Sequence, residues 1–471
     1  MKIFSKETYK NRRTELKRKM GSGVLLFFGN EESRMNFKDN WYPFRQDSTF
    51  LYFFGLDMPG LTAVIDVDQD LEVIFGDNLT TIETIWQGSH PPLSDLAAAV
   101  GIEKTKSKSE ISTFLYSVDG QKIHFLPPYR PENSQKLESW LTKSQLEIHS
   151  SVSEKFIKAV VSLRSIKSEE EILEITNAVN MSVKMHKRLM REAKPGMKEY
   201  ELLGLVNYEA ISSGGSVSFP PIITIDGQIL HNHNYSNTLA NGKMLLGDFG
   251  AESAMHYAGD ITRTTPVGSK FSDSQREIYQ IVLNAYQSAV ALCKPGVLFK
   301  DVHLSASKKL AEGLKDLGIM KGNLDDAVHH GAHALFFQCG LGHMMGLDVH
   351  DMEDLGEQYV GYNEELLKSS QFGLKSLRLG KELEKGFVIT IEPGIYFIPK
   401  LIEQWEAEKL HSDYINYEKL ALFHNFGGIR VEDGYVISET GSMLLGEPLP
   451  IEIKDVERFK EGSIIFENHK K

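Results

Sequence analysis

Two aspartates interrupt a segment that otherwise has the composition of buried β-strands. In the stretch LLGDFGAESAMHYAGDITRT, residues 245–264, Asp248 breaks an apolar run and Asp260 directly precedes the strand-forming Ile261. Aspartate is depleted from strands, and a buried carboxylate without a partner is costly enough that it usually neutralises. The two aspartates therefore need a compensating charge, and metal ions could supply it.

Three further polar clusters stand at or near the ends of strand-like runs. They are GLGHMMGLDVHD with His343 and His350, ITIEPG with Glu392, and GIRVED with Arg430 and Glu432. In the last cluster the two charged residues alternate with apolar neighbours, which points both into the same space. Four carboxylates and one imidazole form an oxygen-rich ligand set. Such a set suits Mn²⁺-like ions, whereas structural zinc is typically bound by thiolates. Four carboxylates also favour two divalent ions over one, with some carboxylates bridging.

Each of these residues also has an ordinary structural interpretation. An aspartate at a strand is more often a turn or cap residue, and a lone histidine such as His343 is more often hydrogen-bonded than bound to a metal. Glu432 could simply pair with Arg430. On spacing alone, a dinuclear metal site is one hypothesis among these.

Length and composition restrict the class of protein. A chain of 471 residues exceeds what one hydrophobic core usually organises, so we expect two domains. The net charge of -12 argues against a nucleic-acid partner. Cys293 and Cys339 are the only cysteines, which fits a reducing cytoplasm. The basic start lacks the apolar region of a secretory signal, and no apolar run approaches the roughly 20 residues of a membrane helix. We expect a soluble, cytoplasmic protein with no membrane partner.

The first third of the chain predicts an α/β domain, which we place at residues 1–165. Apolar runs at residues 23–29, 48–56 and 61–67 predict buried strands. After the boundary, Ser168 with Glu171 forms a capping box that starts a long amphipathic helix. Because the domain has no ligand cluster, we expect it to serve assembly and to close the mouth of the active site. Its aromatic stretch at residues 40–55 is mostly core or lines that mouth, and Trp86 is the candidate to reach a neighbouring subunit's site.

The remainder of the chain has the pattern of a duplication. Lys-Pro-Gly triplets at residues 194–196 and 294–296 each stop one helix and start another, and acid-bearing strands follow each helix pair. The triplet alone is a common helix stop, but the matching order of elements favours two related halves with the site between them. Residues 356–385 and 399–426 are interpreted as insertions with short helices and little chemistry.

The order of the polar clusters resembles that of the pita-bread metallopeptidases. Within them the chain resembles aminopeptidase P, the Xaa-Pro aminopeptidases, and the related prolidases. The resemblance covers nearly the whole chain, and AGDITRT, GLDVHD, EPGIY and GIRVED are specific when taken together. It implies an α/β N-terminal domain followed by an α+β pita-bread catalytic domain, residues 166–471, with a duplicated helix pair and a curved antiparallel sheet.

The resemblance also implies a role for each candidate ligand. Asp248 would chelate one ion, Asp260 and Glu432 would bridge two, and His343 and Glu392 would bind the other. The ions would be two divalent cations, with Mn²⁺ favoured.

Further residues would face the substrate. His231 and His350 match the family's non-ligand histidines, with His233 the weaker candidate, and Arg430 would orient a carboxylate or the substrate by its fixed fork of donors. Cys339 stands where the family usually has another histidine. Either this thiol packs as a small hydrophobe, or it faces the substrate with an ordinary pKa of about 8.5, and oxidants would then inhibit the enzyme through it.

The implied reaction is release of an N-terminal residue that precedes proline. Water activated between the two ions would attack the carbonyl carbon, His350 would help to stabilise the oxyanion, and Glu392 would relay the proton. The substrates would be peptides with proline in the second position, and the enzyme a homo-oligomer, dimer or tetramer. The alternatives are a prolidase acting on Xaa-Pro dipeptides, and an inactive pita-bread binding protein, which the complete ligand set disfavours.

Overall fold

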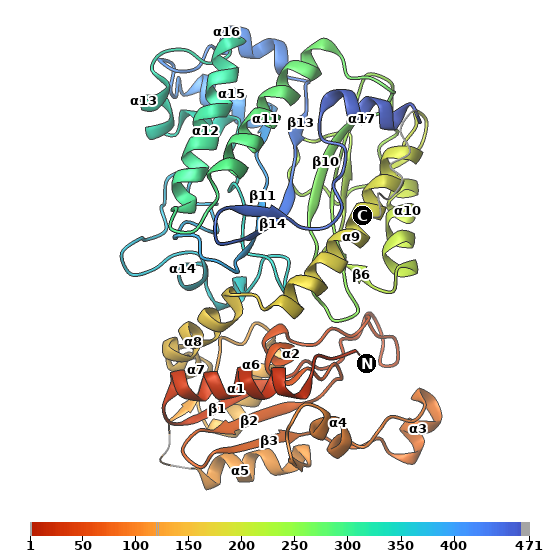
Figure 1. Ribbon diagram of the computed structural model, residues 1–471, viewed down its shortest axis with the longest axis vertical. Helices are drawn as coiled ribbons and strands as arrows, with labels where there is room; N and C mark the ends of the chain where they lie inside the picture. The colour runs from red at the N-terminus through yellow and green to blue at the C-terminus, as the bar shows by residue number, and fades with distance from the viewer. Residues whose placement is uncertain (1, 119, 121, 463–471) are drawn as a thin grey trace. The chain divides into compact units, whose positions relative to one another are not determined.

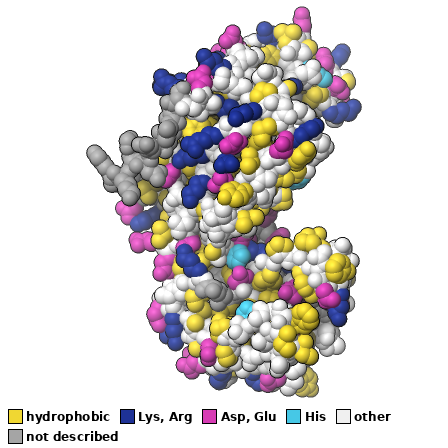
Figure 2. Space-filling view, turned by 90° about the vertical axis from the view of Figure 1, so that its right-hand side faces the viewer, with side chains coloured by type: hydrophobic (Ala, Val, Ile, Leu, Met, Phe, Trp, Pro, Cys, Tyr) yellow, Lys and Arg dark blue, Asp and Glu magenta, His cyan; other side chains and the backbone are white. Residues whose placement is uncertain are grey.

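A computed structural model of the protein describes residues 2–118, 120 and 122–462 (Figure 1). The chain divides into two units: residues 1–164 with 352–359, and residues 165–351 with 360–471. None of the helices in the described residues has both the length and the apolar character that crossing a membrane requires. On the face drawn in Figure 2, acidic and basic side chains intermingle, so neither sign of charge covers that face.

The first unit contains a five-stranded mixed sheet with the strand order β4-β3-β2-β1-β5. Its strands are β1 (Val24–Phe28), β2 (Thr62–Asp66), β3 (Leu71–Phe75), β4 (Lys104–Lys106) and β5 (Ile123–His124). Its helices are α1 (Lys6–Met20), α2 (Ser48–Phe54), α3 (Thr81–Gln87), α4 (Leu93–Ala99), α5 (Ile111–Ser117), α6 (Pro131–Leu141), α7 (Gln145–Ser151) and α8 (Glu154–Ser165), which runs to the boundary. The α/β class is confirmed, and the runs at residues 23–29 and 61–67 form β1 and β2.

The predicted strand at residues 48–56 is wrong, because this segment forms helix α2. Asp47 caps the helix by accepting a hydrogen bond from the backbone N–H of Phe50 at 2.7 Å, and Gly55 ends it in the left-handed region at φ 63. Every residue of α2 is buried. A short apolar run buried on all sides has no periodicity that distinguishes helix from strand.

The aromatic side chains of the first unit divide between core and surface. Phe50, Phe53 and Phe54 on α2 are fully buried, so much of the aromatic stretch is core. Helix α3 instead buries none of its residues, and Trp86 is 83% exposed. Helix α3 is therefore one exposed part of this unit that a partner could cover.

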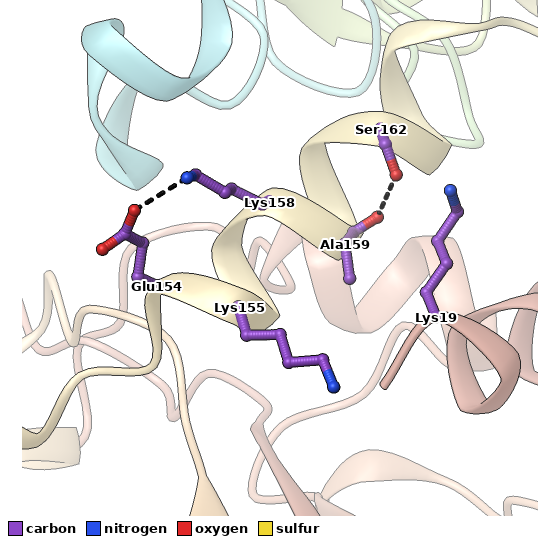
Figure 3. Close-up of a pocket in the computed structure, with 6 residues that line it drawn as sticks. All are labelled: Lys19, Glu154, Lys155, Lys158, Ala159 and Ser162. Atoms are coloured by element: carbon purple, nitrogen blue, oxygen red, sulfur yellow. Dashed lines mark hydrogen bonds and ion pairs between the residues drawn. The ribbon is translucent and has the colours of Figure 1, made fainter. Parts of the chain in front are cut away.

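A surface hollow of about 500 Å³ lies along α8 in the first unit (Figure 3). Its lining residues are Lys19, Glu154, Lys155, Lys158, Ala159 and Ser162. Lys158 and Glu154 form an ion pair at 2.8 Å on the exposed side of the helix, and the Ser162 hydroxyl donates to the Ala159 carbonyl at 2.8 Å. None of the predicted site residues lines this hollow.

The second unit contains two helix pairs around small antiparallel sheets. Its helices are α9 (Glu169–Glu192), α10 (Glu199–Ser212), α11 (Asp273–Leu292), α12 (Phe299–Asp316), α13 (Leu324–His329), α15 (Pro399–Ala407), α16 (Tyr417–Leu420) and α17 (Ile453–Lys460). Helix α14 (Glu357–Val360) begins in the segment 352–359, which belongs to the first unit. The predicted capping box is confirmed, since Ser168 and Glu171 cap α9 reciprocally at 3.3 and 3.0 Å. The short helices α14, α15 and α16 lie in the two predicted insertions.

The sheets of the second unit have the strand orders β10-β8-β7, β11-β14-β15, β12-β13 and β6-β9. Their strands are β6 (Ser216–Val217), β7 (Ile222–Thr224), β8 (Met244–Phe249), β9 (Ala251–Glu252), β10 (Ile261–Pro266), β11 (Val388–Ile391), β12 (Gly394–Tyr396), β13 (Gly428–Arg430), β14 (Asp433–Ile437) and β15 (Ser442–Leu444). All of these pairings are antiparallel.

The two helix pairs are related in detail, which confirms the predicted duplication. Each Lys-Pro-Gly turn places its glycine in the left-handed region, at φ 92 for Gly196 and φ 82 for Gly296. The N–H of Gly196 donates to the Leu239 carbonyl at 2.8 Å, and the N–H of Gly296 donates to the Leu383 carbonyl at 2.9 Å. Equivalent turns therefore contact the segments that lead into equivalent antiparallel strand pairs, β8–β10 and β11–β14.

The repeat extends to the acidic residues. The backbone carbonyl before each first strand, of Lys243 and of Phe387, accepts a hydrogen bond from the end of the second strand at 2.9 and 2.8 Å. Asp248 and Glu392 follow these carbonyls at the same spacing. The two acids therefore occupy equivalent positions in the two halves.

The alternation of β8 decides which way Asp248 points. Leu245 and Phe249 join the apolar core formed with α9 and α10. Between them, a Cβ at Gly247 would lie 2.5 Å from Leu189 on α9, so this face is packed tightly against the helix. Because side chains alternate along a strand, Asp248 points to the opposite face, away from the helices.

Candidate metal centre

A buried histidine aligns the strands that carry the two aspartates. Asp260 immediately precedes β10, whose Thr262 pairs with Asp248 on β8. The Nε2–H of His186 donates to the carbonyls of Phe249 at 3.2 Å and of Ile261 at 2.9 Å, the residues that follow the two aspartates. Burial lowers the pKa of His186 to about 3. The ring is therefore a neutral donor that fixes the backbone beside both acids.

In the second half, backbone hydrogen bonds place the imidazole next to the other acids. The N–H of His343 donates to the Thr390 hydroxyl at 3.2 Å, and its carbonyl accepts from Thr390 at 3.0 Å. Glu392 directly follows β11, and its N–H donates to the Leu341 carbonyl at 2.7 Å. The Nδ1–H of His343 donates to the Met344 carbonyl at 3.0 Å. This tautomer leaves the Nε2 lone pair directed at the acids, as in many metal-binding histidines.

The structure brings most of the predicted ligands together. The Nε2 atom of His343 lies 3.4 Å from Asp260 Oδ2 and 3.7 Å from Glu392 Oε1. One ligand atom each from Asp260, His343 and Glu432 lie within 4.8 Å of one another, and all three residues are buried. Asp248 is connected to the group through Arg430.

Arg430 links Asp248 to the rest of the group. Its Nη2 pairs with Asp248 Oδ2, and its Nε donates to the Thr262 hydroxyl at 3.2 Å. The same hydroxyl donates to Glu432 Oε2 at 2.6 Å. Arg430 and Glu432 therefore share one space, as their alternation predicts, but the carboxylate that pairs with Arg430 is that of Asp248.

The electrostatics of the cluster fit bound cations. Burial, followed by the charge of neighbouring acids, raises the pKa values of Asp260 and Glu432 well above their usual range. Burial also raises the pKa of Glu392 to about 7. Asp260 Oδ1 and Glu432 Oε1 are buried without a hydrogen-bond partner among the described residues. Unpartnered carboxylate oxygens that repel one another, beside a single imidazole, are a donor set suited to divalent ions of the Mn²⁺ type.

Two predicted substrate-side histidines lie at or near this cluster. The ring of His350 packs edge-on against that of His343, with centroids 4.4 Å apart. Partial burial and the nearby Arg430 lower the pKa of His231, and Asp248 acts in the opposite direction. The His231 side chain remains exposed, as does that of His233, the weaker candidate.

The ordinary pKa expected for Cys339 is wrong. Burial, followed by the negative charge of Glu392, raises the pKa of this thiol to about 12. Its sulfur lies 3.8 Å from the Tyr396 hydroxyl. Because the thiolate is the reactive form, Cys339 is neutral and poorly reactive near pH 7.

Sequence reasoning missed three residues around the centre. The Thr262 hydroxyl bridges Arg430 and Glu432, and the Tyr396 hydroxyl accepts from Arg430 at 2.7 Å. Arg378, in an insertion predicted to be poor in chemistry, contributes to lowering the pKa of His231. Strand alternation gave a usable signal for Thr262, but no spacing rule connects Arg378 to the site.

Comparison with known proteins identifies the family. Residues 174–439, more than half of the chain, match the model of metallopeptidase family M24. The chain belongs to this family. The M24 match contains all five predicted metal ligands, and residues 9–124 match the aminopeptidase P N-terminal domain. The two-domain fold, with a pita-bread metallopeptidase domain, and the enzyme class inferred from the sequence are thereby confirmed.

Relatives of this M24 metallopeptidase are similar over nearly their whole length. It is 32% identical to human Xaa-Pro dipeptidase, over 93% of this chain and 89% of the relative. It is 31% identical to an Escherichia coli Xaa-Pro aminopeptidase, over 94% and 95%. The structure matches proline aminopeptidase P II from Yersinia pestis with a TM-score of 0.81 and 28% identity, covering 97% of this chain and 100% of that one. It matches E. coli aminopeptidase P with the inhibitor Pro-Leu at 0.81 and 29%, covering 98% and 99%.

Proposed function

We propose that the protein is a dinuclear metal-dependent aminopeptidase that releases the N-terminal residue preceding proline. The observation that carries the proposal is the buried acid cluster around His343, with unpartnered oxygens on Asp260 and Glu432. The names of the relatives, Xaa-Pro aminopeptidase and Xaa-Pro dipeptidase, support proline next to the scissile bond.

The proposed ligand set is the one expected from the sequence. Asp248, Asp260, His343, Glu392 and Glu432 would together hold the two divalent ions, with the carboxylates of Asp260 and Glu432 at the centre of the group. The oxygen-rich donor set supports Mn²⁺. Arg430 would hold Asp248 in place, because its Nε and Nη2 contact Thr262 and Asp248 together.

The protein's own groups would divide the remaining chemistry. Bound divalent ions lower the pKa of water and polarise a carbonyl group. Glu392, at the edge of the cluster, accepts a proton and passes it to the leaving amine. His350, beside His343, donates a hydrogen bond to the carbonyl oxygen of the scissile bond as negative charge develops there. His231, which lies within electrostatic range of Arg430 and Asp248, would contact the substrate.

We also propose the assignment of the two domains and the setting in which they work. Residues 1–165 form a domain for assembly and for closing the site, and residues 166–471 form the catalytic domain. The protein works in the cytoplasm as a homo-oligomer, dimer or tetramer, on peptide substrates rather than nucleic acid. Its two free cysteines support a reducing compartment.

One assay tests the activity. Purified protein loaded with Mn²⁺ is given Xaa-Pro-Yaa tripeptides, matched Xaa-Ala-Yaa tripeptides and Xaa-Pro dipeptides. The proposal expects cleavage of the proline tripeptides well above the other two, and no cleavage of proline tripeptides would refute it. A dominant dipeptide activity would favour a prolidase, the alternative that the similarity to human Xaa-Pro dipeptidase supports.

A further inference from the structure

A buried ion pair packs under the loop that carries His343 and His350. Lys167 Nζ lies 2.7 Å from Asp351 Oδ2, and each side chain is only 1% exposed. Burying two charges costs solvation energy that their attraction often fails to repay, so such a pair is weak evidence for stability. Asp351 directly follows His350. A role in placing this loop accounts for the pair better than stability does.

Asp351 also closes the loop onto itself. Its N–H donates to the carbonyl of Met344 at 2.9 Å, and its Oδ1 accepts from the N–H of Asp348 at 3.4 Å. A Cβ at Gly346 would lie 2.5 Å from Asp351 Oδ2 and 3.0 Å from Lys167 Cε. The pair therefore fills the space under the loop, and only glycine fits above it.

The other partner is anchored independently of the loop. The N–H of Lys167 donates to Gly386 at 2.9 Å, and the next residue, Ser168, caps helix α9. A fixed backbone holds the ammonium group in place, and the loop is pinned to it.

The pair also lies close to the places where the chain passes between the two units. The second unit begins at Ser165, and its first segment ends at Asp351. The next residue, Met352, has a left-handed φ of 63, which is uncommon outside glycine and turns the chain sharply. The pair thus holds the loop at the point where the chain leaves the second unit.

We propose that Lys167 and Asp351 are positioning residues that hold His350 toward the substrate side of the metal centre. The proposal rests on the proposed function for its catalytic consequence. His343 has separate backbone bonds to Thr390, at 3.0 and 3.2 Å. Loss of the pair therefore displaces His350 while leaving metal binding intact. A displacement of about 1 Å can cost about 10²-fold in rate, so we expect kcat to fall about 10- to 100-fold with KM little changed.

The variants are chosen to separate positioning from stability. Asp351→Asn removes one charge at nearly constant volume. The double variant Lys167→Met/Asp351→Leu replaces the pair with apolar side chains, which often restores folding stability, and so covers failure of the single variant to fold. Lys167→Arg retains an ion pair. Lys385→Met is the matched control, because Lys385 pairs with Glu439 at 2.6 Å on the exposed surface of the same unit.

The first measurement is independent of activity. In full-length protein carrying ¹³C-labelled histidine and loaded with Mg²⁺, the His350 ring signal is assigned from its absence in His350→Ala. We expect this signal to shift or broaden in Asp351→Asn and in the double variant, and to be unchanged in Lys385→Met. An unchanged His350 signal in both pair variants would overturn the proposal.

The second measurement is a double-mutant cycle on peptide hydrolysis with Mn²⁺-loaded protein. Asp351→Asn should lower kcat in the wild-type background and have little further effect in His350→Ala, with equal metal content throughout. Lys167→Arg, which retains an ion pair with Asp351, should keep most of the wild-type rate. An equal loss in both backgrounds shows that the pair does not act through His350 and sinks the proposal. A wild-type protein without activity refutes the proposed function instead, and the histidine spectrum still decides the positioning role.

Discussion

Two buried histidines of the second unit are expected to lower its stability in acid, in addition to His186 of the metal centre. His303 on α12 and His333, in the 3-10 turn Ala332–Leu335, are 0% and 2% exposed. Their ring centroids are 6.5 Å apart. None of their four ring nitrogens has a hydrogen-bond partner among the described residues. Burial lowers the pKa of His303 to about 3 and that of His333 to about 4.

The sign and size of the effect follow from proton linkage. In the unfolded chain both histidines titrate near the ordinary histidine pKa of 6.5. Below that pH the unfolded chain binds two protons that the folded chain does not, so stability falls as the pH falls from 6.5 toward the folded-state values. Between pH 8 and pH 5, each histidine should cost about 2 kcal/mol of unfolding free energy, or about 4 kcal/mol together.

Urea unfolding of the full chain at pH 8 and pH 5 measures this cost. His303→Phe and His333→Phe keep an aromatic ring and remove the titrating group, so each should shrink the loss of stability between the two pH values by about 2 kcal/mol. His329→Gln, at an exposed position on α13, is the control and should leave the loss unchanged. Other titrating groups are common to all the proteins and cancel in the comparison. A loss of wild-type size in both phenylalanine variants would refute the argument.

Four other outcomes are expected. Asp260→Asn should remove both metal ions together and abolish hydrolysis, which metal analysis and a peptide assay would show; hydrolysis by fully metal-free protein would contradict the metal mechanism. Asp433→Asn should lower the free energy of unfolding, measured in urea, by about 3–5 kcal/mol. The reason is that Arg263 donates two hydrogen bonds, of 2.9 and 3.0 Å, to the buried Asp433 carboxylate. Wild-type stability in this variant would show that the network is dispensable. Cys339→His should raise kcat/KM several-fold without changing metal content, and unchanged kinetics in this variant would show that the position is dispensable. Thiol reagents should inactivate the natural enzyme only slowly, because the pKa of the Cys339 thiol is about 12. Trp86→Ala should lower kcat/KM while stability stays within about 0.5 kcal/mol, and a strict monomer with full peptide discrimination in sedimentation and kinetics would argue against a role in a neighbour's site.

The local features of the site were predictable where strand alternation or chain order determined them. Alternation placed Arg430 and Glu432 in one space, and the structure joins both through the Thr262 hydroxyl. The pairing of Arg430 with Asp248 was not predictable, because 182 residues separate the two. The raised pKa of Cys339 was missed for a similar reason, since burial beside a carboxylate is a tertiary property.

The helix at residues 48–54 shows a different limit of sequence reasoning. Its apolar run is buried on every side, so the sequence has no polar face from which to read a period. The capping residue Asp47 was the available signal, because its side chain accepts from the N–H of Phe50. Caps are therefore more informative than hydrophobicity for elements that are wholly buried.

The duplicated strand pairs β8–β10 and β11–β14 allow the two sides of the metal centre to differ. Two identical chains related by a twofold axis would present the same acid from each side, because one substitution appears twice. In this protein both halves belong to one chain, and the equivalent positions hold Asp248 and Glu392. Each side can then change alone: Asp248 is braced by Arg430, whereas Glu392 lies beside His343. Covalent fusion lets a nearly symmetric scaffold present a different acid, with a different neighbour, from each of its two sides, and so give the two sides different chemical roles.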